Sequence, residues 1–75
     1  MVKAIVLVDI NPNITEKTFK KIKGMKEVIE AFQVYGEYDA VFVIKTEHTT
    51  GIQKFVKEIR KLSGITRTVT VIEMI

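Results

Sequence analysis

The chain has 75 residues, enough for one small domain (residues 1–75) that buries a comparatively small share of its surface. It lacks cysteine, which excludes disulfides, thiolate metal sites and iron–sulfur clusters, yet 47% of its residues are apolar, so we expect a homo-oligomer. The net charge of +3 comes largely from lysines and arginines in two predicted helices, and we interpret these as solvated helix faces more readily than as a nucleic-acid footprint.

The first ten residues, MVKAIVLVDI, contain Lys3 and Asp9 and are too short to span a bilayer. We see no signal peptide or membrane segment there, and we expect a cytoplasmic protein. Lysine, glutamate, isoleucine and valine dominate while asparagine, glutamine and proline are sparse, which resembles the composition of hyperthermophile proteins.

Residues 3–10 form a β-branched run of strand length that ends at an Asn-Pro pair. A helix should follow, with Asn13 as its N-cap, Glu16 in the capping-box position and an end near Gly24. Its predicted inner side carries Ile14, Thr18, Phe19, Ile22 and Met25.

A second helix is predicted from an apolar stripe with i, i+3, i+4, i+7 spacing. The stripe consists of Ile52, Phe55, Val56, Ile59 and Leu62. Thr49 or Thr50 is the expected N-cap, and Gly64 suits a Schellman ending. The remaining strands are predicted over Glu27–Tyr35, Tyr38–Thr46 and Thr66–Ile75.

The resulting order, βαββαβ, predicts an α+β, ferredoxin-like domain. Right-handed crossovers would interlock its two halves into a four-stranded antiparallel sheet with both helices on one face. Many functions share this arrangement, so the fold alone predicts none of them.

The strands are apolar on both faces, although helices would cover only one. In the first strand, one side carries Ala4, Val6, Val8 and Ile10, and the other carries Ile5 and Leu7. In the third strand, the two sides carry Ala40, Phe42 and Ile44, and Val41 and Val43. In the last strand, they carry Val69, Val71 and Ile75, and Ile72 and Met74. A second apolar face indicates an interaction surface. We therefore expect a dimer that packs sheet against sheet, as an α+β barrel or sandwich.

Few residues offer catalytic or metal-binding chemistry. His48 stands alone, without the partners of a nucleophilic triad or a metal cluster, and no phosphate-binding glycine motif occurs. We predict no catalytic residue, no metal site and no cofactor.

The stretch Tyr35–Asp39, YGEYD, is the first candidate site. Gly36 and Glu37 suit a two-residue type II′ hairpin turn, which explains the glycine without a ligand. Alternatively, turn N–H groups can bind an anion, while Asp39 or Glu37 meets an ammonium group and a tyrosine ring contacts an apolar side chain. The stretch is thus either a bare turn or a site for an α-amino acid.

The last strand carries a row of hydroxyls, Thr66, Thr68 and Thr70. Threonine is an ordinary strand residue, so this row by itself indicates only a solvent-facing strand.

The order and separation of these pieces resemble the ligand-binding domain of the Lrp/AsnC (feast/famine) transcription regulators, also called the RAM domain. The matching residues are Gly36, Tyr38 and Asp39 before AVFV, and the final GITRTVTVIEM with Gly64, Arg67, Thr68, Thr70 and Ile72. The resemblance covers essentially the whole chain.

This resemblance implies dimers with facing sheets that assemble into rings, commonly octamers, with an amino-acid effector bound between neighbouring dimers. Carried over by position, the ligand contacts are Gly36, Glu37, Tyr38 and Asp39, with Thr66 and Thr68 across the cleft. The implied function is amino-acid sensing and modulation of assembly.

Full-length members of this family begin with a helix-turn-helix domain, whereas this chain begins directly at its first strand. We therefore expect a stand-alone, non-enzymatic sensing domain that does not bind operator DNA itself and can co-assemble with full-length relatives.

Two other functions remain open. An RRM-like RNA-binding module has the same strand order, but only Phe42 is available on the third strand and the first strand supplies no aromatic partner. A small cofactor-free dimeric α+β-barrel enzyme would have to use His48 as its base.

Overall fold

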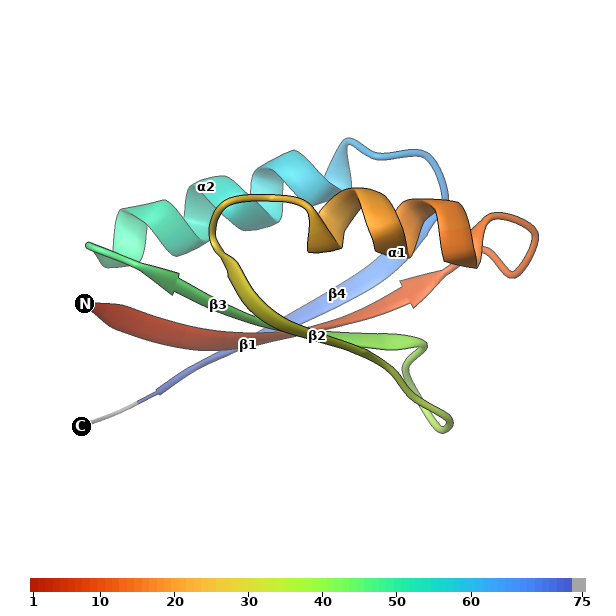
Figure 1. Ribbon diagram of the computed structural model, residues 1–75, viewed down its shortest axis with the longest axis horizontal. Helices are drawn as coiled ribbons and strands as arrows, with labels where there is room; N and C mark the ends of the chain where they lie inside the picture. Colours follow the sequence, from red (N-terminus) through yellow and green to blue (C-terminus); the bar gives the residue numbers. More distant parts are fainter. Residues whose placement is uncertain (74–75) are drawn as a thin grey trace.

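The computed structural model describes residues 1–73, which form the predicted ferredoxin-like βαββαβ fold. The elements are β1 (Val2–Ile10), α1 (Thr15–Lys23), β2 (Val28–Gln33), β3 (Ala40–Thr46), α2 (Thr49–Arg60) and β4 (Ile65–Ile72). The four strands form one antiparallel sheet in the order β2-β3-β1-β4, and both helices cover the same face (Figure 1). The fold prediction is confirmed; residues 74 and 75 of the predicted last strand lie outside the described residues.

The core lies between the two helices and the sheet, because one side of each central strand is apolar. The alternation predicted for the first and third strands is confirmed, and their buried side chains meet the helix residues in one cluster: Ala4, Val6, Val8, Ile10, Phe19, Ile22, Ala40, Phe42, Ile44, Ile52, Phe55 and Ile59. Phe42 is fully buried, and its ring lies 5.4 Å from that of Phe19.

The predicted helix N-caps are wrong. Asn13 does not cap α1; instead the side-chain oxygen of Asn11 accepts from the Asn13 N–H at 3.0 Å, and the helix begins two residues later. Such a local turn is the ordinary competitor of helix capping for asparagine. His48, rather than either threonine, is the N-cap residue of α2, and it makes no side-chain capping bond.

The predicted Schellman ending of α2 at Gly64 is wrong: the helix ends at Arg60, its C-cap Lys61 has right-handed α conformation, and Gly64 lies in the connection to β4. This connection needs Gly64 for two reasons. Its φ of +95° lies in the left-handed region, and an added Cβ would overlap the side chain of Ile14. The chain can therefore turn closely past α1 before β4 begins.

The other sheet face is apolar, and no other part of residues 1–73 covers it (Figure 1). Register places Ile5 opposite Val43 and Val71, and Leu7 opposite Val41 and Val69. Half of the Val71 surface is exposed, and Phe32 on the edge strand β2 is similarly exposed. We call this apolar side of the sheet, with Ile5, Leu7, Phe32, Val41, Val43, Val69 and Val71, the open face.

Neither helix within residues 1–73 is long and apolar enough to cross a membrane.

Candidate functional site

The connection between β2 and β3 is longer than predicted. The strands stop at Gln33 and start again at Ala40, and the Val34 N–H donates to the Asp39 carbonyl oxygen at 3.0 Å. The prediction of a two-residue turn is therefore wrong, and residues 34–39 form a loop that extends past the end of the sheet (Figure 1). Gly36 has φ +137° and open space around it, and Tyr35 is fully exposed.

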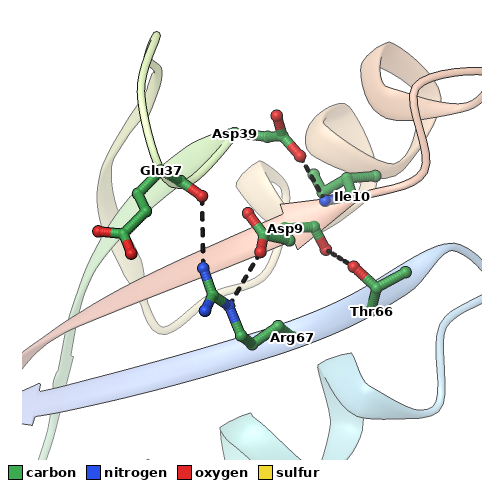
Figure 2. Close-up of polar contacts among 6 residues, drawn as sticks. All are labelled: Asp9, Ile10, Glu37, Asp39, Thr66 and Arg67. Carbon is green, nitrogen blue, oxygen red and sulfur yellow. Dashed lines mark hydrogen bonds and ion pairs between the residues drawn. The ribbon is translucent and has the colours of Figure 1, made fainter.

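Asp39 fastens this loop to the last residues of β1. Its N–H donates to the Val8 carbonyl oxygen at 2.9 Å, and its carboxylate Oδ2 accepts from the Ile10 N–H at 2.8 Å (Figure 2). A carboxylate with a backbone donor is held in one orientation. Asp39 thus has a structural role that the sequence did not indicate.

Arg67 on β4 holds the same loop from the other side. Its Nε donates to Asp9 Oδ2 at 3.0 Å, and its Nη2 donates to the Glu37 carbonyl oxygen at 3.4 Å (Figure 2). Its guanidinium carbon lies 4.5 Å from the centroid of the Tyr38 ring, within the range of a cation–π contact. We call Asp9, Glu37, Tyr38 and Arg67 the Arg67 clamp.

Two residues of the clamp, Asp9 and Arg67, were not among the predicted ligand contacts. Asp9 ends an apolar strand, and Arg67 stands directly opposite it in the β1–β4 register. An acid and a base at the matching ends of two strands were the available signal, but the register that pairs them becomes visible only in the structure.

The threonines do not act as one row. Thr66 lies at the clamp end of the sheet, where its hydroxyl donates to the Asp9 carbonyl oxygen at 3.3 Å. Thr68 and Thr70 stand opposite the buried Val8 and Val6, so they are half-buried on the helix side of the sheet rather than facing solvent as predicted. The hydroxyl of Thr68 accepts from Arg60 Nε at 3.0 Å.

Three of the candidate residues, Asp39, Thr66 and Thr68, line two separate hollows, whereas Gly36, Glu37 and Tyr38 line neither. One, of about 270 Å³, is lined by Thr15, Gln33, Val34, Tyr35 and Asp39. The other, of about 410 Å³, is lined by Arg60, Ile65, Thr66, Arg67 and Thr68. The first contains a carboxylate and the second contains guanidinium groups and hydroxyls, so the two differ in the charge that they would attract.

The fold agrees with the family that the sequence resembles. The family model of the Lrp/AsnC ligand binding domain matches residues 3–74. The chain therefore belongs to this family, as predicted.

Its curated relatives are transcription regulators. The chain is 37% identical over 57 residues to the HTH-type transcriptional regulator Ptr1 of Methanocaldococcus jannaschii, covering 76% of this chain and 38% of that protein. It is 34% identical over 68 residues to the HTH-type transcriptional regulator LysM of Sulfurisphaera tokodaii, covering 89% and 49%. The match thus spans about half or less of the relatives' length.

Solved structures share the whole fold. The protein PHS023 from Pyrococcus horikoshii superposes with a TM-score of 0.91 at 34% identity, covering all of this chain and 92% of that one. TTHA0845 from Thermus thermophilus superposes with a TM-score of 0.94 at 27% identity, and the match covers 99% of this chain and 94% of that one. AsnC from Escherichia coli superposes with a TM-score of 0.87 at 19% identity over half of its own length, which shows a similarity of fold alone.

Proposed function

We propose that this chain is an amino-acid-binding and oligomerisation domain of the Lrp/AsnC type, which modulates the assembly of full-length regulators and is not an enzyme. Such a domain would act in the cytoplasm, together with the regulators. Family membership supports this function. Two proteins of the same fold, from Mycobacterium tuberculosis and Neisseria meningitidis, are described as complexes with L-methionine.

The observation that carries the proposal is the pair of hollows with opposite charge preference. An α-amino acid has an ammonium and a carboxylate on one carbon, so a binding site needs an acceptor and a donor set close together. The Asp39 hollow offers the acceptor, and the hollow with Thr66 and Thr68 offers donors. Because they are separate within one chain, a neighbouring copy would bring the two kinds of surface together.

The open face supplies a surface for the first step of assembly. Its exposed apolar side chains, including Ile5, Phe32 and Val71, would be removed from water by a second copy packed sheet against sheet. In this proposal the dimers associate further, as octamers, and the amino acid binds between them.

The alternatives find less support. Phe42, the ring that an RRM-like surface would need on the third strand, is fully buried under the helices and cannot stack on a base. His48 is an exposed residue at the start of α2, where its carbonyl oxygen accepts from the Thr46 hydroxyl at 2.8 Å.

Isothermal titration with each of the twenty amino acids tests the proposal, with light scattering to follow the assembly. The sharpest variant is Asp39→Asn, because an asparagine oxygen can still accept from the Ile10 N–H while the negative charge is lost. We expect amino-acid affinity to fall about tenfold or more with little change in thermal stability. Asp39→Ala should lower both, since it also leaves the Ile10 N–H without its acceptor. An unchanged affinity in Asp39→Asn would remove Asp39 from the site, and no heat with any amino acid would refute the function.

A further inference from the structure

We propose that Arg60 and Thr68 together bind the carboxylate of the amino-acid ligand. This inference rests on the proposed function and assigns one end of the ligand to residues of this chain. Arg60 is the last residue of α2, and its side chain reaches β4, where Nε donates to the Thr68 hydroxyl oxygen at 3.0 Å.

This hydrogen bond leaves both residues with donors for an anion. A guanidinium carries five N–H groups, of which the contact uses one, so the two terminal nitrogens keep four. The Thr68 hydroxyl oxygen accepts from Arg60, and its own proton is then directed away from the guanidinium. A planar carboxylate can accept from the guanidinium fork and from the hydroxyl at once.

Arg60 is also the guanidinium in this hollow that the clamp does not use. The other, Arg67, pairs with Asp9, contacts the Glu37 carbonyl oxygen and covers the Tyr38 ring. The residues that line the hollow include no aspartate or glutamate to compete with a bound anion. The C-terminal end of α2 carries partial negative charge, so binding there has to come from the side chains.

The hydrogen bond between Arg60 and Thr68 is exposed to solvent, and this exposure limits the affinity for a carboxylate that Arg60 can contribute. Charge-assisted hydrogen bonds in an exposed site are screened by water, so we expect loss of the Arg60 charge to weaken carboxylate binding by about tenfold.

The test compares each amino acid with its amino alcohol, in which CH₂OH replaces the carboxylate. L-methionine and L-methioninol are the first pair; the corresponding pair of another amino acid replaces them if that amino acid binds more tightly. Titrations use the full chain as wild type, Arg60→Gln, Arg60→Lys and the control Lys57→Gln, an exposed lysine one turn earlier on α2 that does not line the hollow.

Arg60→Gln should lower the affinity for the amino acid about tenfold and leave the affinity for the alcohol unchanged. Arg60→Lys should keep part of the acid preference because it keeps the charge, and Lys57→Gln should behave as wild type. Thermal unfolding of each variant identifies any loss of fold. An equal loss for acid and alcohol, or no loss for either, would overturn the assignment of Arg60 while leaving the proposed function intact. Absence of amino-acid binding by the wild type would instead refute the function, and this assignment with it.

Discussion

Replacing Arg67 by alanine should loosen the loop between β2 and β3, because this side chain joins three groups at the end of the sheet. The ion pair with Asp9 is 3.0 Å long, with side chains 48% and 24% exposed, and such a pair contributes up to about 1 kcal/mol. The cation–π contact with Tyr38 adds roughly 0.5–1 kcal/mol. The carbonyl contact at 3.4 Å is long and adds little. We therefore expect Arg67→Ala to lower the free energy of unfolding by about 1–2 kcal/mol.

In a domain of this size that loss corresponds to a fall in Tm of roughly 4–16 °C. Thermal unfolding followed by circular dichroism measures it, at one fixed chain concentration because oligomerisation shifts Tm. Lys57→Ala is the matched control on an exposed helix position, and Arg67→Lys should lose about half as much because it keeps a charge near Asp9. Hydrogen exchange should accelerate at the Val34 amide, which closes the loop. If Arg67→Ala were indistinguishable from Lys57→Ala in both measurements, the clamp would not hold the loop.

Three further predictions test the core, the close approach of Gly64 to Ile14 before β4, and the open face. Phe42→Ala should cost about 3–5 kcal/mol in urea unfolding, because the ring is fully buried; a loss below about 1 kcal/mol would contradict the packing described. Gly64→Ala should cost more than about 1 kcal/mol, since its Cβ would meet Ile14. Gly36→Ala is the control, because φ is positive there too but the space around it is open, and it should cost less; equal losses would show that the contact with Ile14 does not matter. Val71→Asp should lower the average molar mass in light scattering while secondary structure is retained, and an unchanged mass would exclude the open face as an interface.

The fold could be predicted because its elements have recognisable lengths, compositions and ends. β1 is a β-branched run that ends at an Asn-Pro pair, and the apolar stripe of α2 repeats with helical spacing. Both signals depend only on neighbours in the sequence, whereas the side of β1 that faces the helices could not be told from residues that are apolar on both sides. The start of α1 was missed because asparagine can turn the chain locally as readily as it caps a helix, and Asn11 does so before α1 begins.

The site was harder to predict because its contacts join distant segments. Asp39 reaches Ile10 across 29 positions, and Arg67 reaches Asp9 across 58. Neither pairing follows from spacing; both depend on strand register and on the bulge where β4 shifts against β1 near Asp9. Threonine is equally ordinary on either face of an edge strand, so only register could place Thr68 beside the helices.

The most direct test of the proposed function is the molar mass of the protein in solution, measured by light scattering with and without the amino acid that binds most tightly. The proposal predicts a dimer or larger assembly without ligand and a shift in the distribution of assemblies when the amino acid saturates the site, because a ligand held between copies favours one arrangement of them. A mass of one chain in both conditions, with no heat of binding, would contradict it.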